Sequence, residues 1–355
     1  MSRPVRRSRA LRALTACIAL ATIAAACGSD DGAGTTTIAL PQTVIVTHVD
    51  GDPTSQLMGA LYAQALENAG LRVIRKDPIG DRTVYYQALQ QGTVEIVPEL
   101  TGDLLTYLHS IGATPHPATT TTAPTTTTIP GETVPSVPVE DSTTAATTTT
   151  DAGPTTTTTL PTNPRTVTDQ ATVLRALLPF ELSISEPSTA EVKQVIACSQ
   201  TATEAHTLGT ITDLGAVADQ ITLGGPAGFE TSTPLGLGTL ADSYHANFKQ
   251  FVPLTDDQIA DAVKNGTVDC VATSSVNPVI AAQTMTVLLD DKALVDPNAV
   301  MALVNGTAGT ATVLQALNGV DSKLTQTDLT TMLGEMANNK QSPDYLASVY
   351  LSTTS

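Results

Sequence analysis

The chain has 355 residues, a formal net charge of −17 and no tryptophan. Such an acidic protein is a poor partner for nucleic acids and other polyanions, whose binding requires clustered Lys and Arg. The length is sufficient for two packed domains.

The first 26 residues have the pattern of an export signal. Five arginines precede a short apolar run, residues 13–26, which is below the roughly 20 apolar residues that a membrane-spanning helix needs. Ala24-Ala25-Ala26-Cys27 resembles the lipobox of bacterial lipoproteins, in which the cysteine is acylated and becomes the mature N-terminus. We therefore expect Cys27 to be lipidated and to hold the chain at the outer face of the cytoplasmic membrane. Ordinary secretion, with Cys27 as a bystander, is the alternative.

The charge becomes more negative once the signal is removed. All 34 acidic residues and only 12 of the 17 Lys and Arg residues lie after it, so the exported chain carries a net charge of −22. Acidity of this kind keeps a surface protein soluble and indicates no particular ligand.

The tether is expected over residues 27–42. The sequence after it predicts alternating strands and helices. Residues 43–48 form a compact β-branched run, typical of a buried strand. A helix follows, with Thr54 as its predicted N-cap and Gly70 as its stop, and residues 71–74 read as a second strand. The order strand, helix, strand predicts a parallel sheet.

An internal echo links the two halves of the chain. Residues 88–97, ALQQGTVEIV, match residues 262–271, AVKNGTVDCV, and each reads as a helix that ends at a glycine before a strand begins. Chance similarity is the alternative. If the echo is real, the loops after the two strands, residues 98–101 and 272–277, lie at carboxyl strand ends, where open α/β sheets bind ligands.

Residues 113–164 form a low-complexity insert of threonine runs broken by prolines. With no aromatic residue and little apolar content, this segment has too little to bury to offset its ordering entropy. We expect an extended loop without a chemical role, with a composition that is also typical of O-glycosylated stalks.

Cys198 and Cys270 are the cysteines that remain once Cys17 and Cys27 are set aside. An oxidising compartment favours a disulfide between them, and two separately buried thiols are the alternative.

Several blocks, in a fixed order, resemble the solute-binding proteins of ABC importers for osmoprotectants such as glycine betaine, carnitine, choline and proline betaine. The most specific block is Leu223-Gly224-Gly225-Pro226-Ala227-Gly228-Phe229. The other blocks are residues 54–67, 88–92 with 98–102, the positions Leu240, Tyr244, Phe248, Phe251 and Pro253-Leu254, then residues 266–269, 277–278, 289–292 and 322–325.

This resemblance implies an α/β protein with a type II periplasmic-binding-protein fold. Two α/β lobes are joined by two crossing segments, near residues 189–194 and 276–284, around a ligand cleft that closes by a hinge motion. Lobe one is expected over residues 43–112, 165–190 and 281–355, with the insert hanging from it, and lobe two over residues 191–280. The partners implied are an ABC permease and an ATPase on separate chains, and the receptor itself is expected to be monomeric and to need no cofactor.

Members of this family hold a quaternary ammonium in an aromatic cage. The sequence departs from that pattern where Leu100 and Ser274 replace usual aromatic residues, and where Gly51-Asp52-Pro53 lacks a usual lysine. A usual arginine after Phe229 is also replaced, by Ser232 or Thr233.

Polar residues are therefore the candidates for ligand contact, each with a structural alternative such as capping or turn formation. One group lies at a helix N-terminus, where free N–H groups favour an anionic ligand group. The predicted contacts are Thr54, Ser55, Gln56, Thr101, Tyr244, Ser274 and Ser275, with Glu99, Asn277, Gly224 and Gly225 as further candidates and one of Tyr85 or Tyr86 as a replacement cage wall.

Enzyme and metal chemistry find little support in the sequence. The five histidines show no His-x-x-x-His spacing, and Cys-x-x-Cys, Gly-x-Ser-x-Gly and Walker motifs are missing. The leading interpretation is a lipid-anchored, non-enzymatic receptor for a betaine-like or quaternary-amine solute. The alternative is a sensor or interaction lipoprotein that keeps the fold and has lost the osmoprotectant site.

Overall fold

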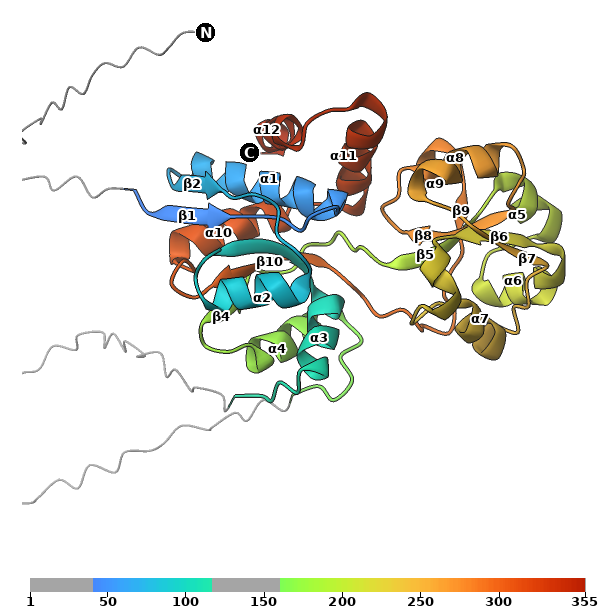
Figure 1. Cartoon of the computed structure of the whole chain (residues 1–355), viewed down its shortest axis with the longest axis horizontal. Helices are drawn as coiled ribbons and strands as arrows, with labels where there is room; N and C mark the ends of the chain where they lie inside the picture. The colour runs from blue at the N-terminus through green and yellow to red at the C-terminus, as the bar shows by residue number, and fades with distance from the viewer. Residues whose placement is uncertain (1–40, 117–159, 355) are drawn as a thin grey trace, which may run out of the picture. The chain divides into compact units, whose positions relative to one another are not determined.

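The computed structural model describes residues 41–116 and 160–354. The predicted signal, Cys27, most of the tether and most of the threonine-rich insert lie outside the described residues. The described chain forms two α/β lobes, coloured mainly blue, green and red for lobe one and yellow to orange for lobe two (Figure 1).

Lobe one is built on a five-stranded sheet with the order β2-β1-β3-β10-β4. Strands β1, β2 and β3 run parallel, and β10 is antiparallel to both β3 and β4. The strands are β1 (Thr43–Val46), β2 (Arg72–Arg75), β3 (Ile96–Leu100), β4 (Leu182–Ile184) and β10 (Val300–Asn305). The helices are α1 (Pro53–Asn68), α2 (Arg82–Gln90), α3 (Thr101–Ser110), α4 (Val167–Leu177), α10 (Ala311–Asp321), α11 (Gln326–Asn339) and α12 (Pro343–Thr354).

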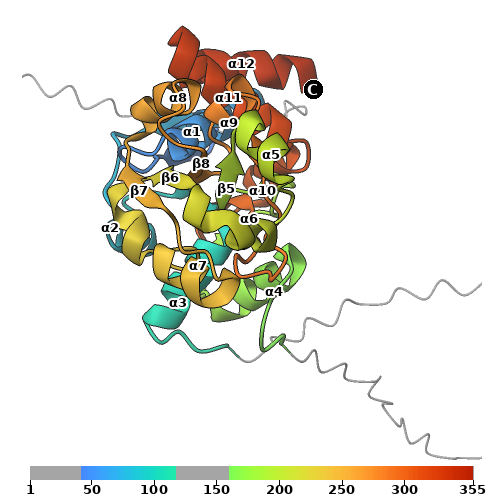
Figure 2. The same ribbon diagram turned by 90° about the vertical axis from the view of Figure 1, so that its right-hand side faces the viewer.

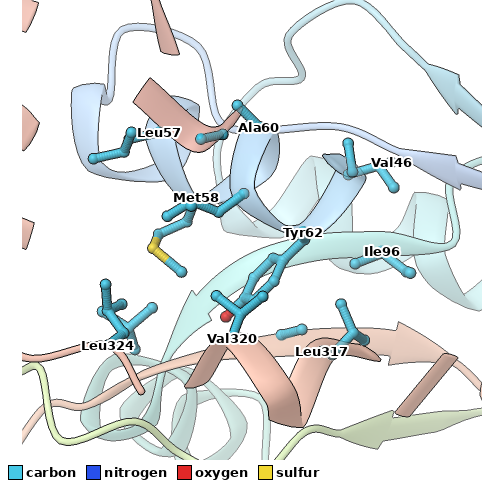
Figure 3. Close-up of a cluster of buried hydrophobic side chains, with 14 of the residues drawn as sticks. Val46, Leu57, Met58, Ala60, Tyr62, Ile96, Leu317, Val320 and Leu324 are labelled. Carbon is cyan, nitrogen blue, oxygen red and sulfur yellow. The ribbon is translucent and has the colours of Figure 1, made fainter. Parts of the chain in front are cut away.

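The interior strand β10 shows why this sheet is covered on both faces. Its residues Val300, Ala302 and Val304 point into a core formed with α1, α10, α11 and α12, whereas Met301 and Leu303 point into a second core formed with α2, α3 and α4. All six residues of β10 are buried, which explains a continuous apolar run instead of an alternating one. Figure 3 shows the first core, where α1 side chains meet those of α10.

Lobe two has a second five-stranded sheet, with the order β7-β6-β8-β5-β9. Its strands are β5 (Gln194–Cys198), β6 (Thr222–Gly225), β7 (Gln250–Pro253), β8 (Cys270–Ser274) and β9 (Thr286–Val287). The helices around it, seen in Figure 2, are α5 (Gln200–His206), α6 (Ile211–Val217), η1 (Ala218–Gln220), η2 (Ala227–Thr231), α7 (Leu237–Tyr244), α8 (Asp256–Lys264) and α9 (Val279–Ala282).

The internal echo is a real structural repeat. Gly92 and Gly266 both have φ +67° and both follow a helix end. In each copy the next N–H returns to the helix, from Thr93 to the Ala88 carbonyl at 3.0 Å and from Thr267 to the Ala262 carbonyl at 2.8 Å. The strands that follow, β3 and β8, occupy the same third place in their sheets, with parallel partners on one side and an antiparallel partner on the other.

Two segments connect the lobes, and one boundary differs from the prediction. The first connection, between β4 and β5, agrees with the expected crossing near residues 189–194. The second lies later than residues 276–284, because β9 belongs to the lobe-two sheet and Ile211 donates to the Leu289 carbonyl at 2.9 Å. Lobe two therefore extends past residue 280, and the return crossing precedes β10.

Helix α1 begins earlier than predicted. Asp52, not Thr54, is the N-cap, since its Oδ1 accepts the N–H groups of Thr54 at 2.8 Å and Ser55 at 3.1 Å. Pro53 occupies the first turn, where its missing N–H costs nothing. The helix ends before Gly70, which has φ +82° as expected of a glycine stop. In the part of the chain that the structure describes, no helix has both the length and the apolar character needed to cross a bilayer.

Cys198 and Cys270 form a disulfide in lobe two. They face each other directly in the antiparallel register of β5 and β8, and both are fully buried. The bridge closes a sequence separation of 72 residues.

Candidate functional site

A cavity of about 260 Å³ opens in lobe one, at the carboxyl ends of its parallel strands. This is the edge at which open α/β sheets bind ligands. Its walls come from the chain after β1, the first turns of α1, α2 and α3, the end of β3, and β10. The lining residues are Val49, Asp52, Thr54, Ser55, Met58, Asp81, Arg82, Tyr85, Pro98, Glu99, Leu100, Asp103, Val192 and Val300.

An ion pair between Arg82 and Glu99 forms the centre of the polar wall. Nε and Nη2 of Arg82 each lie 2.9 Å from one carboxylate oxygen of Glu99, in a bidentate arrangement. The same carboxylate accepts the Tyr85 hydroxyl and, at 2.8 Å, the N–H of Leu100. The Glu99 side chain is only 2% exposed, whereas the Arg82 side chain that neutralises it is 28% exposed.

These contacts shift the protonation equilibria of the cluster. Burial alone would lower the pKa of Arg82, but hydrogen bonding and charge attraction from Glu99 outweigh it and hold the pKa far above its usual value. Burial and the Glu99 charge raise the pKa of Tyr85 well beyond its usual range. Arg82 therefore stays charged and Tyr85 stays protonated at physiological pH.

Asp103 is the carboxylate that remains incompletely paired. Its Oδ2 lies 3.5 Å from Nη2 of Arg82, its Oδ1 accepts Nδ2 of Asn298 at 3.2 Å, and its side chain is 49% exposed. Burial raises the pKa of Asp103, and Glu99 adds to this, against the lowering effect of Arg82. The charge of Arg82 therefore does not fully offset the cost of burying this carboxylate.

The helix N-termini at the cavity are capped from within the protein. Asp52 caps α1 and Asp81 caps α2, where it accepts the Val84 N–H at 3.3 Å. Asn298 caps α3, accepting the N–H groups of Gly102 at 2.9 Å and Asp103 at 3.1 Å. The expected anion site at the start of α1 is therefore occupied by a side chain of the protein itself.

Of the residues predicted at the start of α1, two line the cavity. Thr54 and Ser55 are in its wall, and Ser55 Oγ accepts the Val49 N–H at 2.9 Å. Gln56 is exposed and does not line it. Of the tyrosine pair, Tyr85 lines the cavity, whereas Tyr86 packs edge-on against Tyr107 with ring centroids 5.2 Å apart.

Thr101, a predicted ligand contact, does not line this cavity. Thr101 is fully buried, donates to Gln170 Oε1 at 2.6 Å and accepts the Ala299 N–H at 3.0 Å. These two hydrogen bonds connect the first residue of α3 to α4 and to the start of β10, so the role of Thr101 is structural. Glu99, two residues earlier, does line the cavity.

The predicted lobe-two contacts are not in the lobe-one cavity. Tyr244 is 2% exposed, lies in a hydrophobic core, and gives its hydroxyl to Asp290. Ser275 Oγ accepts the Lys193 N–H at 3.2 Å and donates to the Glu191 carbonyl at 3.1 Å, so it ties the first crossing segment to the end of β8.

Four further candidates have structural roles or lie elsewhere. Gly224 and Gly225 permit close packing, since a Cβ there would lie 2.7 Å from Leu254 and 3.2 Å from the Ala272 side chain respectively. Ser274 is half-buried at the end of β8, and Asn277 donates to Thr273 Oγ1 at 2.9 Å.

Sequence reasoning missed the charged half of the site, namely Arg82, Asp103 and the two capping aspartates. Asp81-Arg82 precedes a helix and Asp103 opens one, which are ordinary positions for solvated charges. Helix α3 follows β3 directly in the chain, and only the tertiary fold brings the start of α2 beside them.

A family model for the substrate-binding domain of ABC-type glycine betaine transport systems matches residues 42–353. The chain belongs to this family. Its members are substrate-binding domains of ABC-type glycine betaine transport systems.

Solved structures agree on the type II periplasmic-binding-protein fold. A glycine betaine/carnitine/choline ABC transporter protein superposes with a TM-score of 0.66 at 15% identity, over 87% of this chain and 98% of its own. Ligand-free YehZ of Escherichia coli gives 0.61 at 18% identity, covering 89% and 99%. A choline-binding protein in complex with choline gives 0.50 at 13% identity, covering 87% of each chain. No curated protein matches the chain in sequence.

Proposed function

We propose that this family member is a lipid-anchored receptor that binds a small osmoprotectant-like solute with a positively charged nitrogen and delivers it to an ABC permease. The observation that carries the proposal is the lobe-one cavity, where four carboxylates and one guanidinium line a space at the carboxyl ends of the parallel strands. A volume of about 260 Å³ suits a small solute, because it lies just below the usual range for ligand pockets.

The second part of the proposal concerns the position of the receptor. Cys27 follows a basic and then apolar segment, and acylation there would keep the receptor at the outer face of the cytoplasmic membrane, close to its permease. A single acyl chain gives only marginal membrane binding, so stable anchoring requires the multiple chains of a lipoprotein modification.

Binding is tested with calorimetry and thermal shift against glycine betaine, carnitine, choline, proline and other small amines. A saturable signal with one of them, together with stabilisation that grows with ligand concentration, supports a receptor. Silence across the whole panel would contradict it and favour the alternative of a sensor that keeps the fold, for which Leu100 at a usual cage position is the supporting observation.

The anchor is tested separately by cell fractionation of the wild-type chain and Cys27→Ala. We expect the wild type in the membrane fraction and the variant in the soluble exported fraction or unprocessed. A matched Cys17→Ala variant should behave as the wild type does. Equal distribution of wild type and Cys27→Ala would contradict the anchor while leaving the solute site untouched.

A further inference from the structure

The chemistry of the lobe-one cavity narrows the class of solute. This step rests on the proposed function, since it takes that cavity as the place where the charged nitrogen binds. Quaternary ammonium groups have no N–H donors and are bound best over aromatic ring faces. Ammonium and guanidinium groups with N–H donors are bound best by carboxylates.

The cavity offers little to a quaternary ammonium. Tyr85 is the one aromatic residue in its lining, and that side chain is 2% exposed with its hydroxyl committed to Glu99. Leu100 occupies the place of a second ring. With no tryptophan in the chain, an aromatic cage cannot be completed by that residue type.

The cavity also offers little to a ligand carboxylate. Arg82 uses Nε and Nη2 on Glu99, and Asp103 lies 3.5 Å from Nη2, so an incoming anion at this guanidinium would meet two carboxylates beside it. Asp52 accepts the N–H groups of Thr54 and Ser55 in α1, and Asn298 accepts those of Gly102 and Asp103 in α3. Asp81 accepts the N–H of Val84 in α2. Most of the donors that bind an anion at other helix N-termini are therefore already used.

Acceptors for N–H groups are abundant by contrast. Asp52 and Asp81 each cap a helix through Oδ1, and within residues 41–116 and 160–354 the Oδ2 of each accepts no hydrogen bond. The Asp103 side chain is half exposed. It accepts one hydrogen bond from the Asn298 amide and lies 3.5 Å from the Arg82 guanidinium. Because Glu99 cancels Arg82, the remaining lining charge is that of these three aspartates.

We infer that the lobe-one cavity binds a small organic cation that carries N–H donors and no carboxylate, with Asp103 as its main counter-charge. The ligand class is thus a primary or secondary alkylammonium or a guanidinium compound, and not a betaine. The role of the Arg82–Glu99 pair is to hold the wall in place and to exclude an anionic group.

Four probes separate the two chemical features. Ethanolamine and choline differ only in N-methylation, as do glycine and glycine betaine. The amino acids of the second pair carry a carboxylate where the alcohols of the first pair carry a hydroxymethyl group. We expect calorimetry to give at least a tenfold tighter affinity for ethanolamine than for choline, and at least a tenfold weaker affinity for glycine than for ethanolamine. Putrescine and agmatine extend the test to longer N–H cations.

Substitutions then locate the contact. Asp103→Asn should weaken binding of the tightest N–H cation at least tenfold, while Asp261→Asn, an equal charge change on the exposed face of α8, should leave it unchanged. Thermal unfolding of both variants without ligand checks that each is folded.

The outcomes distinguish the two proposals. Choline or glycine betaine binding as tightly as ethanolamine overturns this inference and leaves the solute receptor standing. Undiminished binding by Asp103→Asn also overturns it. Silence with all six probes overturns the inference together with the proposed solute site.

Discussion

Arg82 and Glu99 form a bidentate ion pair, with Nε and Nη2 each 2.9 Å from a carboxylate oxygen, between the first turn of α2 and the end of β3. The Glu99 side chain is 2% exposed and that of Arg82 is 28% exposed, so the two partners differ in their access to water. Substitution of Arg82 and substitution of Glu99 should therefore lower the free energy of unfolding by different amounts.

We expect Arg82→Met to lower the free energy of unfolding by roughly 3–5 kcal/mol, because it leaves a buried carboxylate without its counter-charge. Glu99→Met should cost less, since the freed guanidinium can reach water. The double variant should cost less than the sum of the two. Urea unfolding measures all three, and the matched surface pair Arg175–Glu186, at 2.8 Å and largely exposed, should show a coupling of at most about 1 kcal/mol. Strict additivity at Arg82 and Glu99 would contradict this account.

Asp321 gives lobe one a pH-dependent stability. Burial raises the pKa of this carboxyl to about 7, against the lowering effects of hydrogen bonds from Ser185 and Tyr62, each 2.7 Å away. Figure 3 shows Tyr62 reaching between α1 and α10, where Asp321 ends the helix. Its unfolded pKa is about 3.9, so between pH 4 and 7 the folded chain binds the extra proton.

The sign follows from this linkage. Stability from Asp321 is fully present below about pH 4 and is lost as the pH rises to about 7, a change of about 4 kcal/mol at most. Asp321→Asn removes the titrating proton, so its unfolding free energy should lose this slope and exceed that of the wild type above pH 7. Denaturant unfolding from pH 4 to 8 checks the difference, with the exposed Asp261→Asn as the control. Parallel pH profiles for wild type and Asp321→Asn would rule the mechanism out.

The Cys198–Cys270 bridge should stabilise lobe two. A disulfide that closes a loop of this length contributes about 2–4 kcal/mol, mainly by restricting the unfolded chain. We expect the double variant Cys198→Ala/Cys270→Ala to unfold at a lower urea concentration than the oxidised wild type. Wild-type protein whose disulfide has been reduced in the unfolded state should have the same urea midpoint as the double variant. Equal midpoints for oxidised and reduced wild type would contradict a stabilising bridge.

Cation binding should depend on the protonation of Asp103. Burial and Glu99 raise the pKa of this carboxyl, Arg82 lowers it, and a bound cation would favour the ionised form. Affinity for the tightest N–H cation should therefore fall as the pH drops through the pKa of Asp103. Calorimetry between pH 4 and 8 measures the slope, and Asp103→Asn should flatten it. An unchanged slope in that variant would assign the pH dependence to another group.

The local sequence patterns are sufficient to predict many of the strands and helices and the repeat that links the two lobes. The β-branched run at residues 43–48 became β1, and the two helix–glycine–strand units became equivalent parts of the two lobes, because a glycine stop and a buried strand are properties of a few adjacent residues. Those local signals, in their fixed order, were also sufficient to predict the family that the match over residues 42–353 shows.

Which polar residues contact one another depends on how the helices and strands pack. Thr101 and Asp103 lie two residues apart at the start of α3, yet one is fully buried as a joint between helices and the other faces the cavity. Arg82 and Asp103 are distant in sequence and look like ordinary helix-start charges until α2 and α3 pack beside β3. Periodicity assigns a residue to a face of its own element, but contacts between elements depend on how those faces pack, and the chemistry of the cavity depends on those contacts.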